Sequence, residues 1–140
     1  KAGDQIIIAA SDYDYALSTN QKSNNRGQAA ITRDGVTVAF GDDVQILTLE
    51  TGTVDGTFAL NTGSGYLYAA SSNDNYLRTE ETLSANSSWK ITITDSVATV
   101  TAQGANTRNV MQYNSTSTLF ACYSSASQKP IAIYKLTVIE

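Results

Sequence analysis

The chain has 140 residues, of which 41% are apolar and 16% charged, and it carries a net charge of −4 with no histidine. This length is sufficient for one domain, residues 1–140, with a real hydrophobic core. A negative chain without a basic cluster argues against nucleic acid and anionic membranes as partners. No apolar run reaches the length of a membrane span.

The first third of the chain predicts short strands separated by polar turns. Ile6–Ala10 and Tyr15–Leu17 form the arms of one hairpin, and Asn20–Gln28 is predicted as a polar loop. Residues 31–38 predict an extra hairpin, because Arg-Asp-Gly supplies its turn. Val44–Leu49 alternates between apolar and polar residues and is predicted as a barrel strand.

The middle third gives the clearest pattern. A hairpin is predicted from Phe58 to Ala69, turning at Gly63-Ser64-Gly65, where glycines permit positive φ. After a polar loop, Tyr76–Thr79 is a short strand. After a second loop, Trp89–Ile93 is rich in β-branched residues and is predicted as a strand.

The last third follows the same order. Its strands are predicted at Val97–Ala102, Asn109–Met111, Phe120–Tyr123 and Ile131–Leu136. We expect residues 137–140 to begin a linker or to end the protein.

These three thirds read as repeats of one four-stranded unit, approximately residues 6–55, 56–96 and 97–136. Three sets of landmarks align, at Ile8, Phe58 and Val100, at Leu17, Leu67 and Val110, and at Val44, Trp89 and Ile131. One insertion of about five residues in the first repeat, at the extra hairpin, accounts for the unequal spacing. The sequence therefore predicts an all-β fold, a β-trefoil, with another closed β-barrel or a β-sandwich as the alternative.

The residues for most catalytic chemistry are missing. Without histidine, a nucleophilic thiol would have no imidazole base, and Cys122 lies in an apolar strand that predicts a buried side chain. Trp89 aligns with apolar residues and is expected in the core. No pair of carboxylates stands out as a glycosidase site. We therefore expect no enzyme activity and no cofactor.

The stretch Asp12-Tyr13-Asp14-Tyr15 interleaves acids with aromatic rings. Tyrosine faces stack on the apolar side of sugar rings, and carboxylates accept hydrogen bonds from sugar hydroxyls. A polar turn with core tyrosines explains the same pattern. A calcium site is a third interpretation, although the glycine and distal glutamate of an EF-hand loop are missing.

A second candidate site follows the middle hairpin. Asn75, Tyr76 and Arg78 combine an amide, an aromatic ring and a guanidinium next to a polar loop, whose Asn and Asp residues could equally serve to stabilise turns. Our predicted ligand-binding residues are Tyr13, Asp14, Tyr66, Asn75, Tyr76 and Arg78. No metal ligands are predicted.

Two resemblances accompany these patterns. The stretches GYLYAAS, NYLRT, SSWKITI, RNVMQYN, LFACYSS and IAIYKL resemble a module near the C-termini of secreted and surface proteins of Bacteroidetes. That resemblance covers Thr57–Leu136 well and implies a secreted or cell-surface bacterial protein with further domains. The stretch FALNTGSGYLYAAS is similar to the first hairpin of ricin-type lectin trefoils. The Gln-x-Trp signature of those lectins is replaced by Ser87-Ser88-Trp89, so their sugar site cannot be mapped residue by residue.

Together these observations predict a non-catalytic carbohydrate-binding module with a polysaccharide or glycan as ligand and at most one site. The alternative is a structural or protein–protein interaction module of a secreted multidomain protein. Exposure of the tyrosines separates the two, because a buried ring offers no surface to a sugar.

Overall fold

The computed structural model describes residues 1–137 and is built almost entirely of strands. The expected linker at residues 137–140 lies, apart from Thr137, outside the described residues. The elements run in the order β1 (Gln5–Ala10), β2 (Tyr15–Lys22), β3 (Asn25–Asp34), β4 (Thr37–Phe40), β5 (Leu47–Thr51), β6 (Phe58–Asn61), β7 (Tyr66–Ala69), β8 (Leu77–Glu80), η1 (Ala85–Ser87), β9 (Trp89–Thr94), β10 (Val97–Ala102), β11 (Val110–Asn114), β12 (Leu119–Tyr123) and β13 (Ile131–Lys135). No helix within residues 1–137 is long and apolar enough to cross a membrane.

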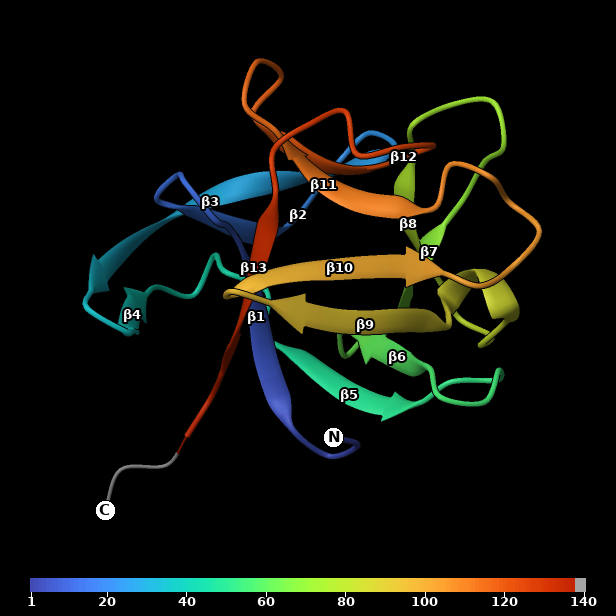
Figure 1. The fold of residues 1–140 in the computed structure, drawn as a ribbon, viewed down its shortest axis with the longest axis horizontal. Coiled ribbons are helices and arrows are strands. Elements are labelled where there is room, and N and C mark those ends of the chain that lie inside the picture. Colours follow the sequence, from blue (N-terminus) through green and yellow to red (C-terminus); the bar gives the residue numbers. More distant parts are fainter. Residues whose placement is uncertain (138–140) are drawn as a thin grey trace.

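Six strands pair in a closed ring. Antiparallel ladders join β1 to β5, β5 to β6, β6 to β9, β9 to β10, β10 to β13 and β13 back to β1. The ladders differ in length, since β9 and β10 share six residue pairs whereas β6 and β9 share one. Figure 1 shows β9 and β10 side by side across the middle of the molecule, with β5 and β6 below them.

The remaining strands form three hairpins, β2–β3, β7–β8 and β11–β12, and an extra strand β4 pairs with β3. Each repeat therefore gives its first and fourth strands to the ring and its second and third strands to a hairpin. The first repeat comprises β1, β2, β3 and β5, the second β6–β9 and the third β10–β13. This arrangement is a β-trefoil, as the repeats predict.

The register of the ring shows which residues are equivalent. Equivalent residue pairs join the first strand of each repeat to its fourth: Ile6↔Leu47, Phe58↔Trp89 and Ala98↔Ile131. The fourth strands thus align at Leu47, Trp89 and Ile131, which are 42 residues apart in both intervals. All three side chains are buried in the main core. The sequence assignment of Val44 to this set is wrong by three positions.

The other two landmark sets also shift in one repeat. Pairing between successive repeats places Ile8, Leu60 and Val100 in equivalent positions, so the second-repeat landmark is Leu60 rather than Phe58. Pairing of the hairpins makes Met111, and not Val110, the counterpart of Leu17 and Leu67. Each corrected residue is at most 1% exposed and lies in the main core.

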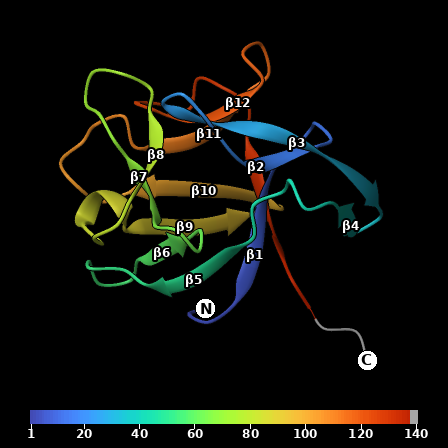
Figure 2. The same ribbon diagram turned by 180° about the vertical axis from the view of Figure 1, so that it is seen from behind.

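Val44 belongs instead to a second, smaller core outside the ring. It bridges to Ser18 and packs with Ile7, Ala9 and Ile31. The extra hairpin β3–β4 covers this cluster and projects from the side of the molecule away from β7 and β8 (Figures 1 and 2). The insertion is therefore where the sequence predicts it. It is longer than five residues, since Ile8 to Leu47 spans 39 residues and the matching Leu60 to Trp89 spans 29.

The predicted loop at Asn20–Gln28 is also corrected, because β2 continues to Lys22 and β3 begins at Asn25. This hairpin is held by polar side chains rather than by an apolar alternation. The Arg26 guanidinium donates to Oε1 of Gln21, at 3.0 Å, and to Oε1 of Gln45, at 3.1 Å. A polar composition was therefore not enough to predict a loop, because this segment pairs as two strands.

The two apolar side chains singled out from the sequence lie in the core as predicted. Trp89 and Cys122 are both fully buried. Burial raises the pKa of the Cys122 thiol far above its ordinary value, because the low-dielectric interior disfavours the thiolate. Cys122 is therefore a small core residue rather than a nucleophile.

Candidate functional site

The β7–β8 hairpin of the second repeat has one face in the core and one face outside. Leu67 and Ala69 on β7 and Leu77 on β8 are fully buried in the main core. Because side chains alternate along a strand, Tyr66 and Tyr68 lie on the opposite face. The register places Tyr66 across from Glu80 and Tyr68 across from Arg78. Two tyrosines, an arginine and a glutamate thus share the outer face of one hairpin.

The tyrosines of the chain divide into three groups by their surroundings. Tyr113 and Tyr123 are buried, at 1% and 6% exposure. Tyr13 and Tyr15 are partly buried against the main core, and Tyr134 against the second core. The other three tyrosines are half-buried and belong to neither cluster: Tyr66, Tyr68 and Tyr76. These three all come from β7 or from the residue that precedes β8.

Several polar groups on this hairpin have no hydrogen bond to any other described residue. They are the guanidinium of Arg78, which is exposed, and the hydroxyls of Tyr68 and Tyr76. Tyr66 differs, because its hydroxyl donates to Oε1 of Glu50 at 3.1 Å. That hydrogen bond to a carboxylate raises the pKa of the Tyr66 phenol. Arg78, Tyr68 and Tyr76 therefore keep donors and acceptors available for a ligand.

The loop between β7 and β8 is anchored to the third repeat. Nη1 of Arg108 donates to Oδ1 of Asn75 at 2.8 Å, and the amide of Thr107 donates to Oγ of Ser72 at 3.1 Å. Oγ of Ser71 accepts from the amides of the two residues at the loop tip. These contacts fix the loop next to the hairpin face. The bond from Arg108 also occupies the side-chain oxygen of Asn75, a residue that the sequence analysis predicted to bind ligand.

Glu80 is held on the other side of the hairpin. Its Oε1 accepts hydrogen bonds from Oγ of Ser84 and, at 2.7 Å, from Oγ of Ser87. Ser84 is the N-cap of the short 3₁₀ helix η1 and Ser87 is its last residue, so the carboxylate connects β8 to the segment before β9. Among the described residues, Glu80 forms no ion pair with Arg78 on the same face.

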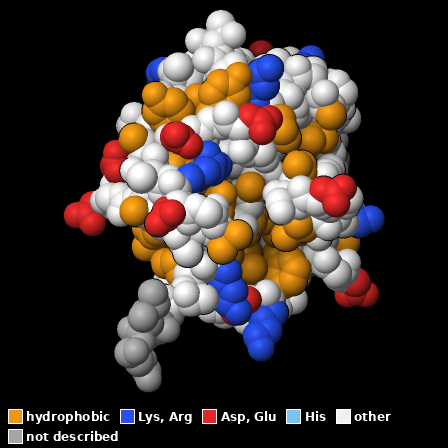
Figure 3. All heavy atoms as spheres, turned by 60° about the vertical axis from the view of Figure 1, so that its left-hand side comes forward, with side chains coloured by type: hydrophobic (Ala, Val, Ile, Leu, Met, Phe, Trp, Pro, Cys, Tyr) orange, Lys and Arg blue, Asp and Glu red, His pale blue; other side chains and the backbone are white. Residues whose placement is uncertain are grey.

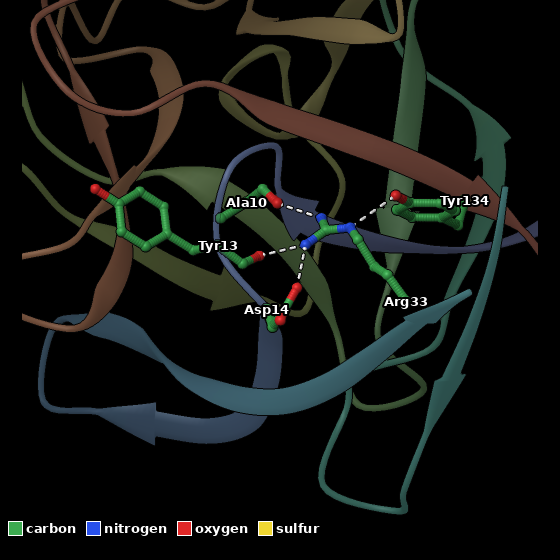
Figure 4. A network of polar contacts seen from close by, with 5 residues as sticks. All are labelled: Ala10, Tyr13, Asp14, Arg33 and Tyr134. Atoms are coloured by element: carbon green, nitrogen blue, oxygen red, sulfur yellow. Dashed lines mark hydrogen bonds and ion pairs between the residues drawn. The ribbon is translucent and has the colours of Figure 1, made fainter. Parts of the chain in front are cut away.

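Tyr13 and Asp14 lie elsewhere, in the loop between β1 and β2. Nη1 of Arg33 donates to Oδ1 of Asp14 at 3.0 Å and to the carbonyl oxygen of Tyr13 at 2.6 Å. Its Nε donates to the hydroxyl of Tyr134 at 3.1 Å, and a further bond reaches the carbonyl of Ala10. Figure 4 shows the guanidinium at the centre of these contacts. Arg33, which lies on β3, thus connects the β1–β2 loop to the extra hairpin.

The ring of Tyr13 points away from Arg33 (Figure 4) and packs on Tyr113, with centroids 5.3 Å apart. Tyr113 in turn packs on Phe120 in the core. No polar or ring contact among the described residues joins Tyr13 or Asp14 to the β7–β8 hairpin. The structure therefore brings together Tyr66, Asn75, Tyr76 and Arg78 from the predicted set and leaves these two apart.

The sequence interpretation missed Tyr68. Its signal was the strict alternation of Tyr66-Leu67-Tyr68-Ala69, which places both tyrosines on one face of a strand. The calcium interpretation of the Asp12 stretch finds no support in the described residues, where no group of three or more potential metal-ligating side chains gathers.

The equivalent hairpin faces of the other two repeats are covered. In the first repeat, the paired Ala16 and Ala29 pack into the second core. In the third repeat, the paired Gln112 and Ala121 are 4% and 0% exposed. Among the described residues, the second repeat therefore differs from the other two in having half-buried tyrosines on this face.

A separate hollow of about 640 Å³ lies between the extra hairpin and strands β1 and β13. Its lining is mainly apolar and includes Ile7, Val38, Phe40 and Leu136. Val36, which also lines the hollow, is 91% exposed. Figure 3 looks onto this side of the molecule, where hydrophobic side chains gather. We call this hollow the β4 groove.

Comparison with solved structures supports the fold. The chain superposes on a GlcNAcα1-4Gal-releasing endo-β-galactosidase from Clostridium perfringens with a TM-score of 0.71 and 11% identity, over 96% of this chain and 33% of the enzyme. It superposes on the BEL β-trefoil with a TM-score of 0.70 and 13% identity, over 97% of this chain and 95% of BEL. It superposes on a Polyporus squamosus lectin with a TM-score of 0.65 and 13% identity, over 97% of this chain and 50% of the lectin.

At these identities the likeness is one of fold, and the chain spans only about a third of the endo-β-galactosidase. No model of a known protein family matches the chain, and no curated protein sequence matches it significantly. The chain is thus a β-trefoil whose function has to be argued from its own side chains.

Proposed function

We propose that this trefoil is a non-catalytic sugar-binding module that contacts glycan through the outer face of the β7–β8 hairpin. The observation that carries the proposal is the position of Tyr66, Tyr68 and Tyr76, the three tyrosines that pack into neither core cluster. The solved structures of this fold include the Polyporus squamosus lectin bound to the epitope Neu5Acα2-6Galβ1-4GlcNAc, and this supports the proposal by analogy.

The binding mechanism follows from the free groups on that face. Tyrosine rings offer flat apolar surface to the C–H face of a sugar ring. The hydroxyls of Tyr68 and Tyr76 and the Arg78 guanidinium supply hydrogen bonds to sugar hydroxyls. A shallow, open face of this kind excludes little water, so we expect weak binding per site. We further propose, from the sequence resemblance, that the module belongs to a secreted or cell-surface bacterial protein.

Affinity electrophoresis in gels containing different polysaccharides tests the proposal. We expect at least one polysaccharide to retard the protein and Tyr68→Ala to weaken that retardation about tenfold or more. Tyr13→Ala tests the sequence assignment of the other candidate stretch and should leave the retardation unchanged, provided that circular dichroism shows a folded variant. Unchanged retardation of Tyr68→Ala and Tyr76→Ala would refute this site.

A second candidate function, protein interaction, rests on the β4 groove. The apolar lining and the exposed Val36 would suit an apolar surface of another domain of the same polypeptide. The low coverage of the endo-β-galactosidase and of the Polyporus lectin, in which a trefoil is part of a longer chain, supports this alternative. Val36→Asp would weaken such an interaction in the full-length protein and leave polysaccharide binding unchanged.

A further inference from the structure

We propose that the glycan bound at the β7–β8 hairpin carries an oxyanion, a carboxylate or a sulfate group, and that Arg78 binds it. This inference rests on the proposed sugar-binding function of the hairpin and adds the chemical class of its ligand. The evidence is the unusual state of Arg78 among the arginines of the chain.

The chain has four arginines, and three of them are committed to structural contacts. Arg26 is only 5% exposed, and its guanidinium donates to the side chains of Gln21 and Gln45 and to the Ser18 carbonyl. Arg33 holds the β1–β2 loop, and Arg108 holds Asn75. Arg78 is the exception, because its exposed guanidinium has neither a hydrogen bond nor an ion pair with another described residue.

The position of Arg78 is that of a ligand-binding group rather than of an isolated surface charge. It lies directly across the ladder from Tyr68 and two residues after Tyr76. The carboxylate that shares its face, Glu80, accepts hydrogen bonds from Ser84 and Ser87 through Oε1 and forms no ion pair with Arg78. An available guanidinium beside available aromatic rings is thus placed where a sugar ring would stack.

The chemistry of guanidinium selects the ligand. Its planar fork of N–H donors matches the two oxygens of a carboxylate or sulfate, and such charge-assisted pairs are stronger than neutral hydrogen bonds. The exposed Asp74 and Glu81 flank the hairpin, and the whole chain is negative. Long-range attraction of an anion is therefore weak, and recognition must come from direct contact with Arg78.

Two matched pairs of polysaccharides distinguish the sources of the oxyanion in affinity gels. Polygalacturonate is compared with its methyl-esterified form, and dextran sulfate with dextran. We expect stronger retardation by the acidic member of one pair. Arg78→Gln should reduce that retardation about tenfold or more, and Arg78→Lys should restore it only in part, because lysine lacks the fork.

Lys90→Gln is the matched control, because it removes the same charge from an exposed position on β9. Equal losses in Arg78→Gln and Lys90→Gln would overturn the proposal by showing a general charge effect. Equal retardation by the acidic and neutral members of both pairs would also overturn it. Retardation that responds to Tyr68→Ala but not to Arg78→Gln would reject the oxyanion and leave sugar binding intact. No retardation by any of these polysaccharides or by neutral ones would reject both.

Discussion

Nε1 of Trp89 donates a hydrogen bond to the backbone carbonyl of Leu67 at 3.0 Å, and both residues are fully buried. This bond links the ring strand β9 to the hairpin strand β7 within the second repeat. The same bond supports β7 from the core side, and the outer face of β7 carries Tyr66 and Tyr68. The only tryptophan of the chain therefore supports the candidate site from inside the core.

Trp89→Phe should destabilise the protein by about 2–4 kcal/mol, because it leaves a cavity and removes the partner of a buried carbonyl. Chemical unfolding followed by circular dichroism measures the change, since the variant has no tryptophan fluorescence. Ile93→Ala on the same strand is the control, because Ile93 is 60% exposed and its truncation should cost less than about 0.5 kcal/mol. Similar losses in the two variants would contradict the structural role of Trp89.

Gly65→Ala should destabilise the hairpin by more than about 1 kcal/mol. Gly65 has a φ of +149°, which side-chain-bearing residues rarely adopt, and an added Cβ would lie 2.9 Å from the backbone oxygen of Glu80. Gly41→Ala is the control, because Gly41 has no positive φ and its added Cβ would meet only a side-chain atom of Asp43 at 3.4 Å. Amide hydrogen exchange should show the loss at β7 and β8 first. A variant as stable as wild type would show that the turn relaxes freely.

Arg26→Met should destabilise the protein by about 1–3 kcal/mol, although an apolar methionine removes a buried charge. Arg26 pairs with Phe120 on β12, and burial lowers the pKa of its guanidinium because the interior disfavours the charge. Its removal leaves the Ser18 carbonyl and the Gln45 side chain, both in buried residues, without their donor. The midpoint of urea unfolding measures the effect. An unchanged or higher midpoint would mean that the buried charge costs more than its hydrogen bonds contribute.

The sequence predicted the fold well because a trefoil repeats one pattern three times, and errors in a single repeat are visible against the other two. The error at Val44 arose because Val44, Ile46 and Leu47 are all apolar, so hydrophobicity alone could not fix the register. The pairing of Leu47 with Ile6 fixes it. A shift of one to three residues is thus the limit of landmark alignment when neighbouring residues are equally apolar.

The candidate site was less predictable, because tyrosine composition does not reveal which ring a strand turns inward. Tyr13 and Tyr76 were both predicted to bind ligand, yet the ring of Tyr13 packs on Tyr113, a residue 100 positions away. Asp14 looked available, yet it faces Arg33 from the inserted hairpin. Long-range contacts decided both cases, one with the third repeat and one with the inserted hairpin of the first repeat, and no local pattern encodes them. Tyr68 was predictable, since alternation along one strand is a local property.

The hydrogen bond from Tyr66 to Glu50 predicts a measurable pH dependence. The pKa of Tyr66 is raised from its ordinary value of 10.0, first because its hydroxyl donates to that carboxylate and also because the phenolate is partly desolvated. A phenol whose pKa is higher in the folded state stabilises the fold below pH 10, and that contribution is lost as the pH rises through the folded-state value.

NMR titration of ¹³C-labelled tyrosine, with Tyr66→Phe to assign the resonance, should show Tyr66 titrating above exposed tyrosine. Glu50→Gln should lower its pKa, because the amide keeps an acceptor but removes the charge that opposes ionisation. A Tyr66 pKa that is unchanged by Glu50→Gln would show that the contact does not persist in solution.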